Sequence, residues 1–134
     1  MNIIVLQGMP NTGKTGTINL IWDLLRNNGG VSTNRQPYGG DPNDFIDTVL
    51  WNNLKIGILS MGDLSTPIAN EIRNFNSQKC DVVVCALSIN NAKVRANNAL
   101  NKFNTTRINK TIAPNQNAEL ATNTADAQTI FNLI

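Results

Sequence analysis

Hydrophobic residues along the chain fall into short runs whose spacing changes between that of strands and that of helices. The first run, residues 1–7, is apolar, rich in β-branched residues and ends at Gly8, as is typical of a buried strand. From Thr15 to about Asn28 the apolar positions recur at helical spacing, and Gly29-Gly30 ends the pattern. The sequence therefore predicts a buried strand followed closely by an amphipathic helix.

Two more apolar runs lie next to each other in the middle of the chain. They cover residues 45–51 and 54–60, and only Asn52-Asn53 separates them. A two-residue connection that contains Asn suits a tight hairpin turn, so we expect these strands to be antiparallel. The segment before them, residues 29–43, is polar and rich in Gly and Pro, and we expect it to be a mobile loop.

The second half of the chain alternates between helical and strand patterns. Ser65-Thr66-Pro67 predicts the start of a helix, with a hydroxyl cap and Pro in the first turn. Residues 81–87 form a continuous apolar run, which is typical of a strand covered on both faces. A helix with inward-facing alanines should follow over residues 92–103, then a weaker strand over 107–113 and a last helix capped by Thr124.

This order of elements predicts an α/β fold, a three-layer sandwich around a mostly parallel five-stranded sheet with one antiparallel edge strand from the hairpin. We expect the strand at 54–60 to lie beside the first strand, and the strand at 81–87 to lie on the first strand's other side. Right-handed crossovers then place helices on both faces of the sheet. The length of 134 residues is that of one domain, so we expect residues 1–134 to form a single domain.

Composition excludes several kinds of chemistry. The chain has no His, which rules out imidazole-based zinc sites and His-based acid–base catalysis. A net charge of +2 without a run of Lys or Arg gives no signal for nucleic acid. Cys80 and Cys85 are expected to be buried on opposite faces of a strand, in a reducing cytosol. The sequence has neither a leader pattern nor a run of about 18 apolar residues, so we expect a soluble cytoplasmic protein without a membrane partner.

One motif carries most of the chemical information. Gly8-Met9-Pro10-Asn11-Thr12-Gly13-Lys14-Thr15 fits the G-x-x-x-x-G-K-[ST] pattern, the Walker A motif, between the predicted strand and helix. Its glycines let backbone N–H groups point at an anion, and the helix start adds unpaired N–H groups and partial positive charge. Lys14 supplies a point charge for the β- and γ-phosphates, and the Thr15 hydroxyl can ligate Mg²⁺. The alternative is a glycine turn with an incidental lysine.

With this motif the sequence resembles the P-loop nucleoside triphosphate hydrolase superfamily, in its small kinase-like or GTPase-like branch. The resemblance is tight over residues 3–28 and loose over 45–134. It implies a set of nucleotide-binding positions, which are Gly8, Asn11, Thr12, Gly13, Lys14, Thr15 and Gly16. An ASCE-type ATPase, of the branch that holds the motor and AAA proteins, would need an extra strand beside the first one and a catalytic Glu after the metal-binding Asp. We expect neither, because Glu71 and Glu119 lie at unsuitable places in the sequence.

The resemblance also implies a carboxylate near the metal, usually at the end of a neighbouring strand. The family pattern has Asp directly after four apolar residues, whereas this chain has Ser60 there and Asp63 three residues later. Asp63 is our candidate to hold Mg²⁺ through a water, opposite Thr15. The alternative for Asp63 is a Gly-Asp turn that leads to the Ser65 cap. Asp81 precedes its strand and should lie at the other end of the sheet, so we discount it.

Phosphoryl transfer usually needs a further cation near the terminal phosphate. Arg95 is a candidate because it follows the 81–87 strand, where similar small kinases carry a lid, and Arg35 is another in the long polar segment. A solvated arginine on a helix face is the alternative for Arg95. Asp41, Asp44 and Asp47 are possible bases, but their spacing favours a polar loop followed by alternating hairpin residues.

The nucleoside is the least defined part of the predicted ligand. The Asn-Lys-x-Asp guanine signature is absent, since Asn109-Lys110 continues as Thr111-Ile112, and we therefore expect ATP and not GTP. Residues 113–117 lie where many P-loop folds contact the base. Trp22 and Trp51 are interpreted as packing residues and not as stacking platforms.

Together these features predict a Mg²⁺-dependent ATP-binding P-loop protein, either a small ATPase or a kinase-like phosphotransferase. The alternative is a nucleotide-dependent switch or binding module whose slow hydrolysis serves a protein partner, with residues 29–43 ordering on the terminal phosphate. The catalytic candidates are Lys14, Asp63 and Arg95. The metal-binding candidates are Thr15 and Asp63.

Overall fold

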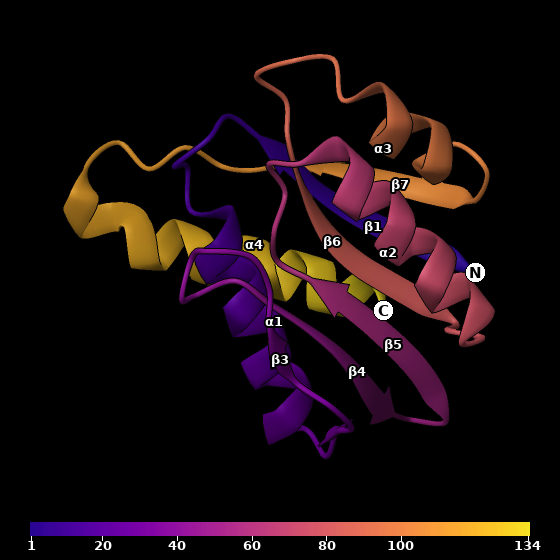
Figure 1. The fold of residues 1–134 in the computed structure, drawn as a ribbon. Helices are drawn as coiled ribbons and strands as arrows, with labels where there is room; N and C mark the ends of the chain where they lie inside the picture. Colours follow the sequence, from indigo (N-terminus) through magenta and orange to yellow (C-terminus); the bar gives the residue numbers. More distant parts are fainter.

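A central β-sheet with helices on both faces makes up the computed structural model, which describes residues 1–134 (Figure 1). The strands are β1 (Asn2–Gly8), β2 (Val31–Ser32), β3 (Gln36–Pro37), β4 (Phe45–Trp51), β5 (Leu54–Leu59), β6 (Val82–Ser88) and β7 (Asn104–Asn109). The helices are α1 (Lys14–Asn27), α2 (Ser65–Ser77), α3 (Val94–Leu100) and α4 (Glu119–Leu133), with a 3-10 turn, η1 (Gln116–Ala118), before α4. This arrangement confirms the predicted three-layer α/β sandwich.

The strands pair in the order β2-β4-β5-β6-β1-β7, and β3 also pairs with β4. Strands β5, β6, β1 and β7 are parallel to one another, and β4 is antiparallel to β5. The expected count of five strands was too low, because β2 and β3 form two-residue strands antiparallel to β4. Both lie within residues 29–43, the segment that we expected to be a loop. They pair with backbone groups that β4, on the outer side of β5, would otherwise leave free.

The expected position of β6 was wrong. β6 lies between β5 and β1, and Val82 is paired with Ile56 on one side and with Asn2 on the other. The continuous apolar patterns of β1, β5 and β6 are alike, so they do not indicate the order of these strands in the sheet. The connection from β5 to β6 through α2 does indicate it, since consecutive parallel strands usually become neighbours. The sheet therefore contains the extra strand, between β1 and β5, that we had not expected. The prediction that β6 is covered on both faces is confirmed, because all its residues are buried.

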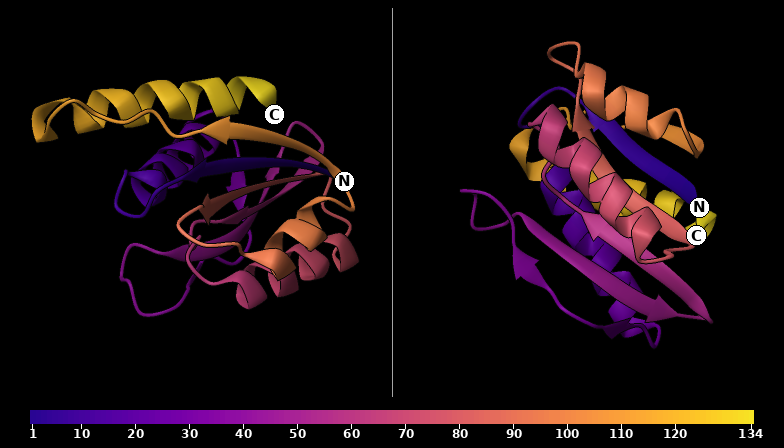
Figure 2. Two further views of the ribbon diagram at one scale, coloured as in Figure 1. Left: turned by 90° about the horizontal axis from the view of Figure 1, so that it is seen from above. Right: turned by 45° about the vertical axis from the view of Figure 1, so that its right-hand side comes forward.

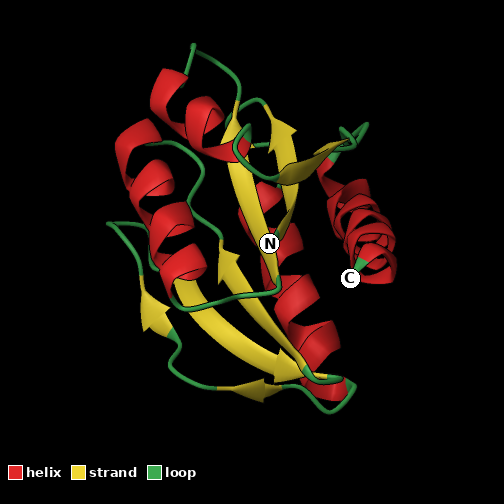
Figure 3. Cartoon of the chain, turned by 90° about the vertical axis from the view of Figure 1, so that its right-hand side faces the viewer, coloured by secondary structure: helices red, strands yellow, loops and turns green.

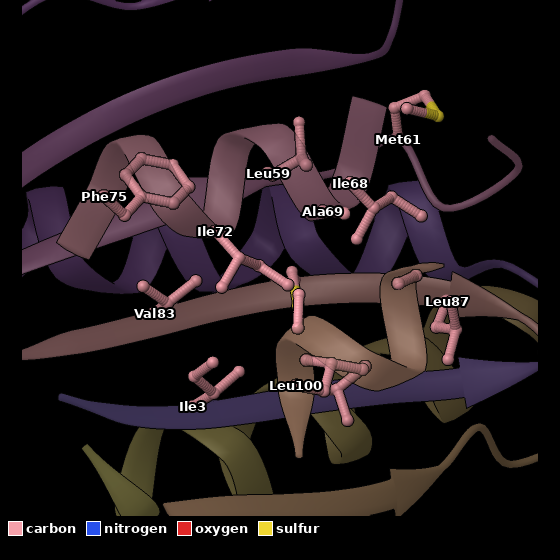
Figure 4. Close-up of a cluster of buried hydrophobic side chains, with 14 of the residues drawn as sticks. Ile3, Leu59, Met61, Ile68, Ala69, Ile72, Phe75, Val83, Leu87 and Leu100 are labelled. Atoms are coloured by element: carbon pink, nitrogen blue, oxygen red, sulfur yellow. The ribbon is translucent and has the colours of Figure 1, made fainter. Parts of the chain in front are cut away.

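Helices α1 and α4 cover one face of the sheet, and α2 and α3 cover the other (Figure 2, left; Figure 3). The side chains of β1 alternate between the two layers. Ile3 and Val5 belong to the core under α2 and α3, whereas Ile4 and Leu6 belong to the core under α1 and α4. Figure 4 shows the first of these cores, between the two helices and the strands β1 and β6. β1 is thus held from both sides, and its end at Gly8 is a fixed starting point for the loop that follows.

The predicted hairpin is confirmed. β4 and β5 are antiparallel, and their last paired residues are Trp51 and Leu54. Asn52 and Asn53 have φ angles of 50° and 61°, the left-handed conformation that a two-residue hairpin turn requires at both positions. Asn tolerates this conformation better than most residues, which explains the Asn-Asn pair at this place.

Several local expectations need correction. Ser65 is the first residue of α2 and does not cap it; its Oγ accepts a hydrogen bond of 2.9 Å from the backbone N–H of Ala96 and so links α2 to α3. Thr124 lies inside α4, where its hydroxyl donates to the carbonyl of Leu120. The α4 segment begins earlier, after a turn in which the Asn115 side chain accepts from the N–H of Ala118.

The last strand and the two cysteines also differ from expectation. β7 covers residues 104–109, so it begins and ends before the predicted 107–113. Cys80 and Cys85 lie in the same buried core, under α2 and α3, and not on opposite faces. The alternation rule did not apply to this pair because Cys80 precedes the first residue of β6. None of the helices combines the length and hydrophobicity needed to cross a lipid bilayer.

Gly57→Ala in β5 is expected to destabilise the fold by about 1–3 kcal/mol, the usual range for overpacking a core. A Cβ at this position would lie 2.5 Å from the ring of Phe75, which is itself buried. Gly40→Ala is the matched control, because a Cβ there meets no atom within 4 Å. Urea unfolding should give a lower midpoint for Gly57→Ala alone, and equal midpoints for the two variants would contradict this packing.

Candidate functional site

A cavity of about 680 Å³ lies at the carboxyl ends of the parallel strands β1, β5 and β6. This is the edge at which open α/β sheets usually bind ligands. Its lining is polar and comes from six parts of the chain: the loop after β1, the first turns of α1, the segment before β4, the end of β5, the end of β6 and the start of α4. The lining residues are Pro10, Asn11, Gly13, Lys14, Thr15, Gly16, Asn19, Asp41, Asn43, Asp44, Ser60, Gly62, Asp63, Ser88 and Glu119.

The loop from Gly8 to Thr15 contributes its backbone to this cavity. The N–H groups of Met9 and of residues 11–16 donate no hydrogen bond within the protein, and the first N–H that does is that of Thr17, to the carbonyl of Gly13. Asn11 and Gly13 have φ angles of 60° and 97°. Left-handed residues placed among right-handed ones turn successive N–H groups toward one side, which creates a concave surface for an anion. The loop therefore presents unpaired donors beside the N-terminus of α1.

Lys14 lies folded back over this loop. Its Nζ donates to the carbonyl oxygens of Gly8 and Met9 at 3.0 and 2.6 Å, and the residue is only 7% exposed. Burial lowers the pKa of Lys14, the negative charge of Asp63 acts in the opposite direction, and the positive charges of Lys93 and Lys110 lower the pKa further. The partners of the ammonium group are neutral carbonyls, so an incoming anion can compete for it.

Thr15, Asp44 and Ser60 form one hydrogen-bonded group beside the loop. The hydroxyls of Thr15 and Ser60 donate to the same oxygen, Oδ1 of Asp44, at 3.0 and 2.9 Å. Ser60 Oγ in turn accepts from the backbone N–H of Phe45 at 2.8 Å. Because the Thr15 proton points to Asp44, the lone pairs of the Thr15 oxygen remain available to a cation.

Sequence reasoning placed Asp44 in a polar loop and so missed this contact. The register of the β4–β5 hairpin pairs Ile46 with Leu59, so the residue just before β4 comes next to Ser60. A carboxylate from the antiparallel neighbour thus reaches the position after the apolar strand where the familiar pattern has its own Asp. The turn at residues 52 and 53 could have revealed this, since it fixes which residues of the two strands lie opposite each other.

Burial is the main cause of the unusual titration of Asp44, which is 7% exposed. It raises the pKa of this carboxyl group, and the hydrogen bonds from Ser60 and Thr15 only partly oppose the rise. The negative charges of Asp41 and Asp63 raise the pKa further. The ionised form of Asp44 therefore lowers the free energy of unfolding, and carboxylates with such perturbed pKa values are typical of functional sites.

Asp63, the predicted metal-binding carboxylate, lines the same cavity as Thr15. Its Oδ1 accepts a hydrogen bond of 2.7 Å from the Ser88 hydroxyl at the end of β6. Of the two carboxylates, Asp44 is the one bonded directly to Thr15, whereas Asp63 follows β5 and is bonded to Ser88 at the end of β6.

The predicted arginines do not reach the cavity. Arg95 points to α2, where its Nη1 lies 3.3 Å from the hydroxyl of Thr66. Arg35 stacks on Trp22 and Phe45, with its guanidinium carbon 4.4 and 3.8 Å from the two ring centroids. Both arginines have partners in the fold, and neither lines the cavity. Lys14 is the only basic residue among those that do.

Of the other acidic candidates, one lines the cavity and two lie outside it. Asp41 lines the cavity, whereas Asp47 is buried beneath α1 and accepts hydrogen bonds from Trp22 and Ser32. Asp81 accepts from the N–H of Lys55 at the amino end of β6, away from the cavity, as expected. Residues 113–117, where we expected the base to bind, do not line the cavity.

Helix α4 supplies two residues that sequence reasoning did not assign to the site. Glu119, which we had placed at an unsuitable position, lines the cavity. Asn123, one turn further along, lies against the first turn of α1: a Cβ on Gly13 would be 2.5 Å from its Oδ1, and one on Gly16 would be 3.0 Å from its Nδ2. Glycine is therefore required at both positions by the close approach of α4, and at Gly13 also by its φ of 97°.

No cluster of three or more carboxylate, thiolate or imidazole groups could hold a metal ion by itself. Mg²⁺ does not need such a cluster when a phosphate ligand brings it, because it keeps several waters and binds one or two carboxylates. Thr15, Asp44 and Asp63 fit that role.

Comparison with protein-family models, with curated proteins and with solved structures finds no match to this chain.

Asp44→Asn is expected to raise the stability of the fold near pH 7. The raised pKa means that the folded state binds the proton of Asp44 more tightly than the unfolded chain does. Ionisation of Asp44 therefore lowers the stability of the fold as the pH rises from 3.8, the ordinary pKa of this carboxyl group, through its raised pKa in the folded state. Asn keeps an acceptor oxygen for Thr15 and Ser60 but carries no charge. Urea unfolding should show a higher midpoint for the variant near pH 7, and the difference should vanish by about pH 3. Asp23→Asn, at an exposed position, is the control and should have little effect; a similar gain in both variants would contradict this explanation.

Proposed function

We propose that this protein binds a nucleoside triphosphate together with Mg²⁺ at the Gly8–Thr15 loop, with ATP as the expected nucleotide. The observation that carries the proposal is the set of unpaired N–H groups at Met9 and residues 11–16, five of which belong to residues that line the cavity. Those of residues 14–16 are the first-turn donors that an α-helix leaves unpaired, and Met9 and residues 11–13 add four more from the loop. A polyphosphate has the charge and the acceptor oxygens to satisfy them.

Each part of the ligand has a partner in the proposed complex. The N–H groups of the loop and the N-terminus of α1 bind the phosphate oxygens. Lys14 exchanges its bonds to the carbonyls of Gly8 and Met9 for charge-assisted bonds to phosphate. Bound Mg²⁺ would neutralise charge on the phosphates, with the Thr15 hydroxyl and the Asp44 carboxylate as its ligands and Asp63 on the opposite side.

These contacts support membership of the P-loop superfamily and a function as a small ATPase or phosphotransferase, in which positioning and electrostatics carry the reaction. The placement of β6 between β1 and β5 is the strand arrangement that the sequence analysis required of an ASCE-type ATPase. The second requirement, a Glu directly after the metal-binding Asp, is not met, because Leu64 follows Asp63 and Phe45 follows Asp44.

A second function, a nucleotide-dependent switch that serves a protein partner, is favoured by one observation. Lys14 is the only basic residue that lines the cavity, while four acidic residues line it: Asp41, Asp44, Asp63 and Glu119. Fast phosphoryl transfer usually needs a second cation at the terminal phosphate, which a partner can supply in trans. Asp41 and Asn43, from the segment before β4, also line the cavity, so that segment can respond to the ligand.

Lys14→Ala is expected to weaken ATP binding by about tenfold or more, because a charge-assisted hydrogen bond to phosphate is lost. The fold should persist, since Lys14 contacts only loop carbonyls through its ammonium group. Calorimetric titration measures the affinity, and circular dichroism checks the fold. Lys102→Ala is the matched control, at an exposed lysine outside the cavity. Undiminished ATP binding by a folded Lys14→Ala variant would remove the basis of the proposal.

Asp44→Asn is expected to reduce the gain in ATP affinity that Mg²⁺ provides by about ten- to a hundredfold, the usual effect of disturbing a metal site. Asp63→Asn should have a smaller effect, because Asp63 bonds to Ser88 and not to Thr15. The measurement compares ATP titrations in Mg²⁺ and in EDTA for both variants and for Asp23→Asn. A larger loss in Asp63→Asn than in Asp44→Asn would reverse this assignment of the metal carboxylate.

A further inference from the structure

Three carboxylate groups enter the cavity from the side of the sheet, those of Asp41, Asp44 and Asp63, and one, that of Glu119, comes from the helical layer of α1 and α4. Asp44 and Asp63 lie just before β4 and just after β5, and Asp44 is tied to Thr15. Glu119 is the first residue of α4, which packs along α1 (Figure 1). It lines the cavity together with Gly13 and Gly16, from the first turn of α1 and the residue before it. Glu119 therefore approaches the cavity from the layer of α1 and α4, whereas Asp44 and Asp63 approach it from the sheet.

Asn123 shows how closely α4 approaches the start of α1 beside the cavity. Residues four apart on a helix share a face, so Asn123 lies on the same side of α4 as Glu119. It is 6% exposed, its carboxamide lies against Gly13 and Gly16, and its buried Oδ1 has no hydrogen-bond partner. A buried polar atom without a partner costs stability, and in natural proteins such atoms are uncommon. Asn123 thus marks where α4 comes closest to the start of α1, and Glu119 lies one turn earlier on the same helix.

The charge of Glu119 limits what it can contact. Its carboxylate makes no hydrogen bond or ion pair in the protein; the one ion pair, between Lys110 and Asp126, lies elsewhere. Glu119 is exposed, so water solvates its carboxylate in the free protein. The carboxylate repels phosphate groups, whereas a neutral part of the ligand that donates hydrogen bonds is a partner that it can accept from. In a nucleoside triphosphate the first neutral part next to the phosphates is the sugar, and in a ribonucleotide the sugar carries two hydroxyl donors.

We infer that Glu119 accepts hydrogen bonds from the ribose hydroxyls of the bound nucleotide, and that the site selects ribonucleotides over nucleotides without these hydroxyls. Asn123 is a positioning residue in this account, because it acts through the placement of α4. The inference rests on the proposed function, since it requires a nucleoside triphosphate in the cavity. The structural alternative is that Glu119 only stabilises α4, as acidic residues in the first turn of a helix do.

The test compares Glu119→Gln with the unmodified protein in calorimetric titrations against three probes in Mg²⁺: tripolyphosphate, ATP and 2′,3′-dideoxy-ATP. Gln keeps the length of the side chain and removes its charge. The expected result is ATP binding weaker by about tenfold, as for the loss of a charge-assisted hydrogen bond. Binding of dideoxy-ATP and of tripolyphosphate should be unchanged. Glu71→Gln, on α2 and outside the cavity, is the matched control and should leave all three affinities unchanged.

The probes separate failure of this inference from failure of the proposed function. If Glu119→Gln weakens ATP and dideoxy-ATP equally, or weakens neither, the contact with the ribose hydroxyls is refuted, while binding of tripolyphosphate still supports the phosphate site. Equal weakening of ATP and dideoxy-ATP binding is the result expected if Glu119 contacts an amino group of the base. If the unmodified protein binds neither tripolyphosphate nor ATP, the proposed function fails and the inference fails with it. A role of Glu119 in the stability of α4 alone would change the unfolding midpoint but not the ratio of ATP to dideoxy-ATP affinity.

Discussion

The turn from β1 into α1 is the constraint on which the rest of the site depends. β1 is paired on both sides, by β6 and β7, and α1 is packed against α4, so neither end of the turn can move freely. Within it the chain reverses through left-handed conformations at Asn11 and Gly13, which leaves a row of N–H groups without partners. A rigid frame is needed to keep such donors unsatisfied, because a flexible loop would relax to pair them.

The hairpin of β4 and β5 supplies the acidic side of the cavity in a way that links distant parts of the chain. Asp44 receives hydrogen bonds from Thr15, at the start of α1, and from Ser60, at the end of β5. One carboxylate thus joins the start of α1 to the edge of the sheet. The same hairpin carries β2 and β3 on its outer side, so the segment between α1 and β4 is attached to the sheet and also reaches the cavity.

Much of this arrangement could be predicted from local patterns, because local patterns determine it. The fold class, the hairpin turn at Asn52 and Asn53 and the position of the Gly8–Thr15 loop follow from periodicity and from residues with special backbone preferences. Features that depend on contacts between distant segments could not be obtained in this way. The order of the parallel strands depends on which crossovers pack best, and the place of Glu119 in the cavity lining depends on where α4 docks. The direction of the Arg95 side chain could not be predicted for the same reason, since it is set by the contact of α3 with α2.

The position of Asp44 beside β4 has a consequence for the local unfolding of the site. This residue stands at the beginning of β4, whose outer neighbours β2 and β3 are only two residues long, whereas the loop after β1 is anchored at the centre of the sheet. Local unfolding begins at weakly paired edges and proceeds in separate units. Fraying of the first residues of β4 would withdraw the carboxylate from Thr15 while the row of N–H groups stays in place. Affinity for the cation would then follow the opening equilibrium of the sheet's edge, and affinity for the anion would follow the global stability of the fold.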